Sequence, residues 1–240
     1  RGLQVDAERC DRLRGEVNAM SDSSGRDYVL HRTRETGIGL IRLWFADVAG
    51  RLKEVTVAAE RLGTVLDKGL GVDGGVMGGP TQDESELFLV PDPSTFVLMP
   101  SSESNPGMAR MFCDVKTATG ASAPDDTRAV LKSALNRAAA RGFTFYVGAE
   151  VEHFYVRDDV ATLEPMDRMG RYHPGAADEM GPLEGETLAV LEQLGVGVDW
   201  FHHEDAPGQY KVGLEYRDAL SMGDGLLTYG QVVRQIARRH

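Results

Sequence analysis

Two glutamates, Glu150 and Glu152, stand two residues apart in the segment Phe143–Phe154. Successive side chains of a β-strand point to opposite faces, so a strand here puts both carboxylates on one face. The other face is apolar and carries Phe143, Phe145, Val147, Ala149 and Val151. Carboxylates about 7 Å apart on a half-buried strand repel unless they face water, shared protons or a cation. A hard divalent cation such as Mg²⁺ or Mn²⁺ is one interpretation. A solvated polar face of an edge strand is the other, because the E-x-E pattern is common.

A second polar cluster runs through His202, His203, Glu204 and Asp205 and is followed by a Pro-Gly turn. The strand expected after the turn has an apolar face and a polar face, formed by Tyr210, Val212, Leu214 and Tyr216 and by Gln209, Lys211 and Glu215. A single histidine is more often a structural core residue than a ligand, and that interpretation stays open for both histidines. Two histidines and a glutamate beside a Gly-Gln turn nevertheless favour a functional site.

The elements that must position these clusters follow from apolar periodicity and turn residues. In the first part of the chain, the sequence predicts a helix over 27–35, a hairpin of strands 38–47 and 52–57, a helix over 58–68, and strands 87–90, 96–99 and 108–115. A glycine-rich loop over 69–80 separates them, and it lacks the G-K-[ST] ending of a Walker-type phosphate site. These elements indicate a small α+β domain over residues 22–117.

A linker of small and polar residues, 116–124, leads into a second domain. The sequence then predicts a helix from Pro124 to Gly142 with a buried stripe of Val130, Leu131, Ala134, Leu135 and Ala138. A strand over Phe143–Val156, a helix over 183–194, strands over 197–204 and 209–216 and a helix over 223–239 follow.

Charge, cysteine content and the lack of a long apolar run exclude several classes of protein. The 240 residues include 26 Lys and Arg against 37 Asp and Glu, a formal charge of -11, which argues against nucleic acid as a partner. The two cysteines, Cys10 and Cys113, fit neither a disulfide framework nor a zinc motif. No apolar run is long enough to cross a membrane and no signal pattern opens the chain, so we expect a cytoplasmic protein with no membrane partner. Met20 resembles a natural start, and residues 1–21 are expected to be a poorly ordered extension.

The residues together resemble the glutamine synthetase family of the bacterial type. Gly148–Phe154 is similar to the family's G-P-E-x-E-F-F, and His202–Lys211 is similar to its H-H-E-x-A-P-G-Q-x-E. Further similar segments occur in the same order at Leu43–Gly50, Gly71–Val76, Pro91–Phe96, Met111–Asp114 and Tyr216–Leu220. The resemblance covers residues 25 to 239, and actinobacterial relatives that join glutamate to amines other than ammonia look most similar.

The resemblance implies an α+β fold: an N-terminal β-grasp domain, here 22–117, followed by the first half of a glutamine synthetase-type antiparallel α/β catalytic domain, here 118–240. It implies an ATP-dependent ligase that phosphorylates the γ-carboxylate of glutamate and lets ammonia or an amine displace the phosphate. It also implies a homo-oligomer with active sites between subunits. By matched position, the implied metal ligands for Mg²⁺ or Mn²⁺ are Glu150, Glu152 and Glu204. Asp199 and His202 are implied near the nucleotide, and Asp47 and Tyr172 at the amine, with Asp47 acting across the subunit interface.

The sequence departs from the family pattern at Lys211 and in its length, and these two departures raise the alternative of a non-catalytic homologue. Lys211 stands where the family has an acidic metal ligand, and an ammonium group cannot coordinate a cation, so we expect it to supply positive charge in place of one metal. The family continues for some 200 residues beyond the resemblance, so this chain is expected to be inactive alone. It is either a fragment of a longer ligase or a short homologue. The alternative function is a non-catalytic binding or assembly protein.

Overall fold

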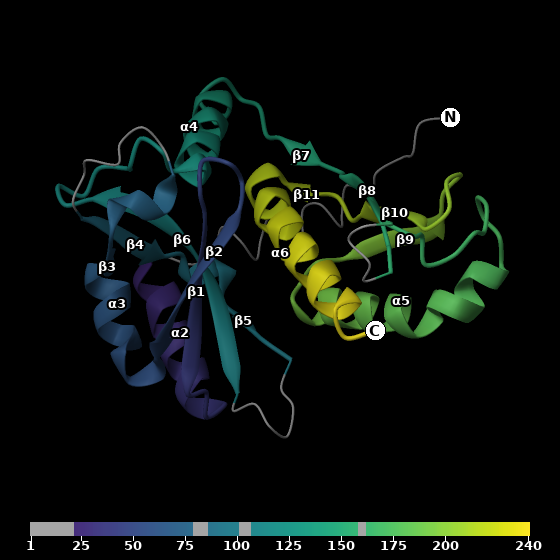
Figure 1. The fold of residues 1–240 in the computed structure, drawn as a ribbon. Helices are drawn as coiled ribbons and strands as arrows, with labels where there is room; N and C mark the ends of the chain where they lie inside the picture. The colour runs from purple at the N-terminus through teal and green to yellow at the C-terminus, as the bar shows by residue number, and fades with distance from the viewer. Residues whose placement is uncertain (1–21, 79–85, 101–106, 158–161) are drawn as a thin grey trace. The chain divides into compact units, whose positions relative to one another are not determined.

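The computed structural model describes residues 22–78, 86–100, 107–157 and 162–240 (Figure 1). These residues form two compact units, one of residues 22–45 with Lys53–Asp125 and the other of Ala46–Leu52 with Asp126–His240. The extension expected over residues 1–21, which includes Cys10, lies outside the described residues. None of the helices in the described ranges has both the length and the apolar character needed to cross a membrane.

The first unit is built on a mixed sheet of six described strands in the order β2-β1-β6-β4-β3, with β5 also paired to β6. The strands are β1 Leu40–Ala46, β2 Leu52–Ala58, β3 Leu70–Val72, β4 Leu87–Pro91, β5 Val97–Leu98 and β6 Met108–Thr117. Strands β1 and β6 run parallel with Leu43 opposite Met111, whereas β4 pairs antiparallel with both β6 and β3. Helices α2 (Asp22–Glu35) and α3 (Leu62–Lys68) complete the unit, with short 3₁₀ turns at Ala59–Arg61, Gly74–Met77 and Pro93–Thr95.

The core of this unit lies between the helices and one face of the sheet. Alternation along β1 sends Ile41, Leu43 and Phe45 into it, each at most 3% exposed, and they meet Val29 of α2 and Leu62 of α3 there. Trp44 points to the opposite face, where its indole N–H donates to Glu54 at 2.8 Å and its ring meets Phe112 edge to face. Cys113, the cysteine within the described residues, lies buried in β6.

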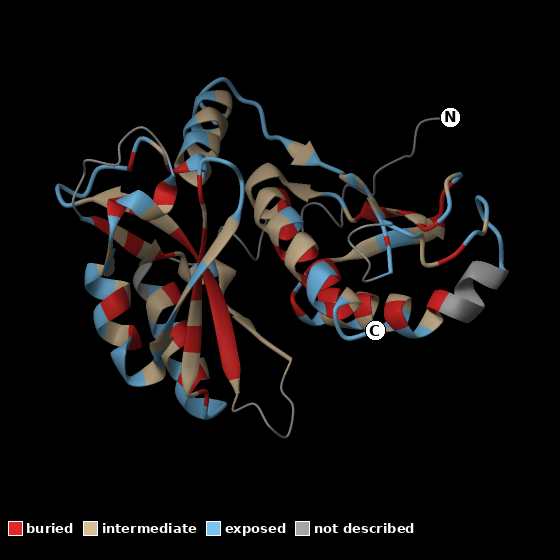
Figure 2. Ribbon diagram, in the orientation of Figure 1, coloured by how far each residue is buried: buried red, intermediate tan, exposed pale blue. Residues whose placement is uncertain are grey.

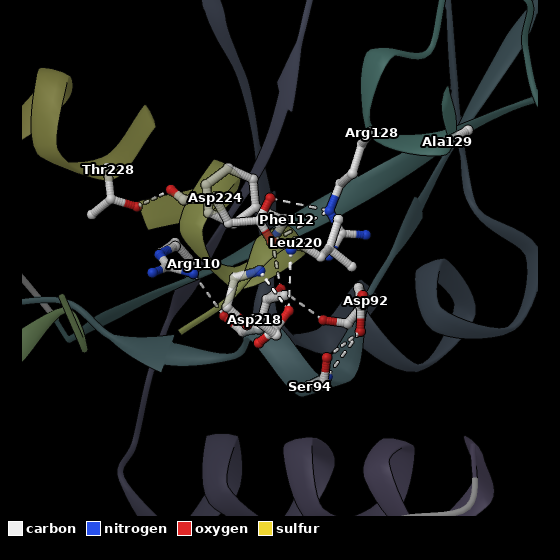
Figure 3. Close-up of polar contacts among 12 residues, drawn as sticks. Asp92, Ser94, Arg110, Phe112, Arg128, Ala129, Asp218, Leu220, Asp224 and Thr228 are labelled. Atoms are coloured by element: carbon white, nitrogen blue, oxygen red, sulfur yellow. Dashed lines mark hydrogen bonds and ion pairs between the residues drawn. The ribbon is translucent and has the colours of Figure 1, made fainter. Parts of the chain in front are cut away.

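Over its described residues, the second unit combines three helices with two small sheets. The helices are α4 (Thr127–Ala139), α5 (Gly175–Gln193) and α6 (Ala219–Ala237), and the sheets are β8-β10-β9 and β11-β7. Helix α4 begins where Asp126 accepts hydrogen bonds from the backbone N–H groups of Arg128 and Ala129. Asp218 caps α6 in the same way, which moves its start four residues ahead of the expected Gly223 (Figure 3). Arg128 and Asp224 then join α4 to α6 through a forked ion pair with distances of 3.0 to 3.3 Å (Figure 3).

The single strand expected over Phe143–Val156 is wrong. It is two strands, β7 (Tyr146–Val147) and β8 (Glu150–Phe154), with different partners: β7 pairs with β11 (Arg217–Asp218) and β8 pairs with β10. The break falls at Gly148, where the Tyr216 ring lies so near that an added Cβ would meet it at 2.8 Å. The close approach explains why the chain has glycine at this break.

The buried stripe expected on α4 is also wrong. No residue of this helix is buried, and Figure 2 shows it in the colours of intermediate and exposed residues. Val130 is 63% exposed. By contrast, α5 and α6 pack on each other and bury Leu183, Leu191, Tyr229 and Ile236. The helix expected over 183–194 also begins earlier, at Gly175, with Pro182 inside it.

Candidate active site

Three antiparallel strands carry most of the predicted site residues on one face. β8 (Glu150–Phe154) and β9 (Val198–His203) flank β10 (Gln209–Leu214). Lys211 of β10 lies opposite Glu152 on one side and His202 on the other, so these three side chains form one row across the sheet. The next row contains Glu150, Gly213 and Trp200, and the Trp200 ring occupies the space that a Gly213 side chain would need.

Lys211 neutralises both glutamates of β8. Its Nζ lies 2.8 Å from Glu150 Oε2 and 3.5 Å from Glu152 Oε1. The hydrogen bond to Glu150 is the main cause that raises the pKa of Lys211 above its usual value, so its ammonium stays charged. The Gln209 amide also donates to Glu152 at 3.0 Å. The two carboxylates, which sequence reasoning assigned to a metal, therefore have a cation of the chain itself between them.

Glu204 follows directly after β9 and is buried, with 5% of its surface exposed. Arg171 donates to it at 2.9 Å, and this hydrogen bond is the main cause that lowers the pKa of Glu204. His202 Nε2 lies 3.8 Å from the same carboxylate. Glu204 is thus held ionised between two basic side chains, next to the row formed by Glu152, Lys211 and His202.

Tyr172 lies beside this cluster. Its ring centroid is 4.6 Å from that of His202, and the Arg171 guanidinium sits 5.5 Å from the Tyr172 ring centroid. Its backbone has a φ of +57°, in the left-handed region that non-glycine residues rarely adopt, while its N–H donates to the His203 carbonyl at 3.2 Å. The side chain is 67% exposed. The strained backbone thus presents an exposed phenol next to the polar row.

Asp199 and Asp47 lie elsewhere. Asp199 is exposed near the start of β9 and lines a separate cavity of about 580 Å³ with Trp200 and Glu215. Asp47 is buried in the turn after β1, where it accepts hydrogen bonds from the backbone N–H groups of Ala49 and Arg51. Of the predicted site residues, the structure gathers Glu150, Glu152, Tyr172, His202, Glu204 and Lys211.

Sequence reasoning missed a buried network beneath this face. The Asp167 carboxylate accepts hydrogen bonds from Tyr210 at 3.0 Å and from the backbone of Met169 at 3.0 Å, and it meets His203 Nε2 at 2.7 Å. Burial opposes its ionisation, but these hydrogen bonds outweigh burial and hold the pKa of Asp167 below its usual range. Asp167 ties the loop that carries Arg171 to strands β9 and β10.

A second buried pair lies on the same side of the sheet. Burial lowers the pKa of His153 to about 4, and its Nδ1 meets the Tyr229 hydroxyl of α6 at 3.0 Å. Burial also raises the pKa of Tyr229 above its usual value. His153 is therefore neutral near pH 7 and serves as a packing residue between β8 and α6.

The carboxylates fit a divalent cation only in part. Within the described ranges, no group of three or more His, Cys, Asp or Glu side chains is arranged to hold a metal ion. Glu150 and Glu152 share a face of β8, and Glu204 directly follows β9. Lys211 already pairs with the first two carboxylates and Arg171 with the third. A metal at these positions would have to displace or accompany two cations, so metal binding stays a prediction.

Two family models match the chain in succession. Residues 37–118 match the glutamine synthetase β-grasp domain, and residues 124–240 match the glutamine synthetase catalytic domain. The chain belongs to the glutamine synthetase family. The predicted α+β fold, a β-grasp domain followed by catalytic-domain sequence, is confirmed.

Curated relatives support the same assignment to a family of ligases. The glutamine synthetase of Mycolicibacterium smegmatis is 38% identical over 218 residues, which are 88% of this chain and 49% of the relative. The glutamine synthetase of Mycobacterium tuberculosis is 35% identical over the same shares of both chains. The chain spans about half the length of the curated relatives that it matches.

Solved structures agree in fold. A structure of GmaS in complex with ADP has a TM-score of 0.78 and 27% identity, over 88% of this chain and 49% of the other. The glutamine synthetase of Plasmodium falciparum has a TM-score of 0.77 at 16% identity, over 92% and 49%, and supports the fold alone.

Proposed function

We propose that this chain contributes the N-terminal part of a glutamine synthetase-like ligase that makes a γ-glutamyl amide from glutamate and ammonia or an amine with ATP. The observation that supports the proposal is the polar row Glu152, Lys211 and His202 with Glu204 and Tyr172 beside it, in a chain that matches both family domains in order. The part of the relatives that this chain does not span would be needed for turnover, so the chain alone is expected to be inactive.

The proposed chemistry has two steps. The γ-carboxylate oxygen of glutamate attacks the γ-phosphorus of ATP, which forms γ-glutamyl phosphate and releases ADP. The amine nitrogen then attacks the acyl carbon, phosphate leaves, and the nitrogen loses a proton. Negative charge collects on phosphoryl oxygens in the first step and on the acyl oxygen in the second, so fixed positive charge nearby lowers both barriers.

The residues have proposed roles in this chemistry. Asp47 and Tyr172 would contact the amine, Asp47 from a neighbouring subunit of a homo-oligomer, and Asp199 and His202 would lie near the nucleotide. Glu150, Glu152 and Glu204 would hold Mg²⁺ or Mn²⁺, which when bound supplies charge for the phosphoryl oxygens. Arg171 and Lys211 already bring two positive charges to this face, and the Asp167 network positions the loop that carries Arg171.

A second candidate function is a non-catalytic member of the family that acts in binding or assembly. The observation that favours it is the pairing of Lys211 with Glu150 and Glu152, because a ligase needs these carboxylates free for metal. In this case, Lys211 supplies permanently the charge that a divalent cation supplies in an active relative.

One experiment separates the two functions. The chain is mixed with the C-terminal half of the Mycolicibacterium smegmatis enzyme, and γ-glutamyl amide is measured by mass spectrometry with ATP, glutamate, Mg²⁺ or Mn²⁺ and either ammonia or methylamine. Product from the wild-type mixture supports the ligase. Product only with Lys211→Glu supports the non-catalytic homologue, and Lys68→Glu, on an exposed lysine of α3, controls for the change in net charge.

A further inference from the structure

Helix α6 and the turn before β2 line a cavity of about 580 Å³ within the second unit. Its polar lining consists of three arginines and two glutamines: Arg51 from the turn, and Gln231, Arg234, Gln235 and Arg238 from α6 and its C-cap. The described side chains that line it include none of those gathered in the candidate active site. Small-molecule sites are typically cavities of this size. The cavity is therefore a separate candidate for ligand binding.

The four polar side chains from α6 lie on one face of the helix. Positions 231, 234, 235 and 238 are three or four residues apart, which places these side chains next to one another. Two arginines four residues apart repel each other, and Arg51 brings a third positive charge from another segment. The helix dipole favours cations in the last turn of α6, but it accounts neither for Arg51 nor for the two amides. The convergence of these groups therefore points to a ligand.

The described side chains that line the cavity do not offset its positive charge. They include no Asp or Glu, although acidic residues outnumber Lys and Arg by 37 to 26 in the whole chain. Arg234 and Arg238 form no ion pair with any other described residue, whereas the adjacent Arg239 lies 2.7 Å from Glu186. The charge in the cavity therefore favours an anionic ligand.

The donor groups fit a phosphate group. A guanidinium can donate two parallel hydrogen bonds to a phosphate, and side-chain amides can donate to its other oxygens. Arg51 Nε lies 3.3 Å from Asp47 Oδ2, but a guanidinium has five N–H groups, so this ion pair engages only part of its donors. A phosphate monoester carries about 1.5 to 2 negative charges and three acceptor oxygens, so it can bind several arginines at once. A single carboxylate has less charge to balance three guanidinium groups.

We propose that this cavity binds a small organic phosphate, with the phosphoryl group on Arg51, Arg234 and Arg238. Leu226 and Leu227 also line the cavity, and Leu226 is 39% exposed, so the leucines offer an apolar surface to the organic part of the ligand. The site lies outside the candidate active site, and the proposal does not depend on whether the chain is part of a ligase.

Isothermal titration of the full 240-residue chain tests the proposal with three probes: inorganic phosphate, phenyl phosphate and benzoate. Inorganic phosphate tests the arginines alone, phenyl phosphate adds an apolar ring, and benzoate combines the ring with a carboxylate. The site variants are Arg234→Gln and Arg51→Gln, which each remove one charge, from two different segments. Arg239→Gln is the matched control, because Arg239 is exposed, follows Arg238 directly and does not line the cavity.

We expect the wild type to bind phenyl phosphate more tightly than inorganic phosphate, and at least about ten-fold more tightly than benzoate. Each site variant should raise the Kd of both phosphates by roughly five- to ten-fold, and Arg239→Gln should change it by less than about two-fold. Leu226→Ala should raise the Kd of phenyl phosphate by about two- to five-fold and leave that of inorganic phosphate unchanged. All variants should keep the wild-type circular dichroism spectrum, since the substituted side chains are exposed.

Four results would overturn the proposal: no binding of either phosphate, equal losses in Arg234→Gln and Arg239→Gln, benzoate bound as tightly as phenyl phosphate, or equal affinity for the two phosphates. A phosphate could also bind Arg171 beside Glu204, so Arg171→Gln is titrated too. Loss of binding in Arg171→Gln and none in Arg234→Gln would place the probe in the candidate active site and overturn the proposal as well. Turnover does not enter these titrations, so their failure and the failure of the proposed ligase are distinguishable.

Discussion

The first unit, called here the β-grasp unit, and the second unit, which contains Asp126–His240 and is called here the catalytic unit, differ in how they use an apolar period. In the β-grasp unit, β1 sends Ile41, Leu43 and Phe45 into a core that α2 and α3 close. In the catalytic unit, the similar alternation of Phe143, Phe145 and Val147 ends at a surface. The two segments have the same kind of pattern and opposite burial. The difference shows that an apolar period predicts which side chains need a partner, but another part of the fold must supply the partner. The β-grasp unit contains helices that cover its sheet, whereas in the catalytic unit α4 has no buried residue and Phe143 and Phe145 remain exposed.

The largest expected effect is on stability, and it tests the difference between the two units directly. Leu43→Ala removes a fully buried side chain and should destabilise the β-grasp unit by about 2 to 5 kcal/mol, while Phe145→Ala should cost less than about 0.5 kcal/mol in the chain alone. Urea unfolding followed by circular dichroism measures both. Similar losses for the two substitutions would show that Phe145 is buried in solution and would remove the contrast between the units.

Acid should destabilise the catalytic unit more than the β-grasp unit. The folded pKa of His153 is about 4 and its ordinary value is 6.5, so the unfolded chain binds more protons between these values. Stability therefore falls as pH drops from 6.5 towards 4, by up to about 3 kcal/mol for this group, and is fully present above pH 6.5.

The check is the midpoint of urea unfolding of the catalytic unit at pH 7, 6 and 5, for the wild type and for His153→Phe with Tyr229→Phe. The second substitution removes the hydroxyl that would lose its partner. The double variant should lose less stability than the wild type on acidification. The described histidine of the β-grasp unit, His31, is exposed, so that unit should respond less. An equal pH dependence of wild type and double variant would show that His153 is not the group responsible.

Loss of the buried carboxylate should loosen the site without unfolding the unit. Asp167→Asn puts an amide in place of the carboxylate that His203 and Tyr210 contact, and it should lower the free energy of unfolding by about 1 to 3 kcal/mol. Tyr210→Phe removes a single hydrogen bond and should lower it by about 1 kcal/mol. Hydrogen exchange should rise in residues 162–174 and remain unchanged in the β-grasp sheet. If exchange rises equally in both units, Asp167 supports the fold generally and does not position the Arg171 loop.

Lys211→Glu is expected to change the stability of the chain least. It tests whether the Lys211 ammonium takes the place of a metal ion beside Glu150 and Glu152. The variant exchanges an ammonium for a third carboxylate beside Glu150 and Glu152, so Mn²⁺ should raise its Tm by roughly 5 °C at a hundred-fold excess over Kd and leave the wild type nearly unchanged. Lys68→Glu is the control of equal charge. Equal Mn²⁺ stabilisation of wild type and Lys211→Glu would show that Lys211 does not replace a metal.

Prediction from sequence succeeded where the signal was local or where motifs recurred in order. The strands β4, β6 and β10 and the family assignment followed from alternation and from seven ordered segments. It failed at Phe143–Val156, because Tyr146–Val147 pairs with β11 and Glu150–Phe154 pairs with β10, two elements distant in the chain. It also missed Asp167, whose partners His203 and Tyr210 come from other elements and leave no spacing to recognise.

The sequence by itself determined the family, the order of the elements, the apolar faces and the replacement of an acidic residue by Lys211. These depend on residue identity and on periods of two and 3.6 residues, which short segments carry. Only the tertiary structure decided that Lys211 reaches both Glu150 and Glu152, that Arg171 holds Glu204, and that the apolar faces of α4 and Phe145 meet at an open groove. Each of these depends on strand register and on helix packing between segments distant in sequence, and no local pattern encodes them.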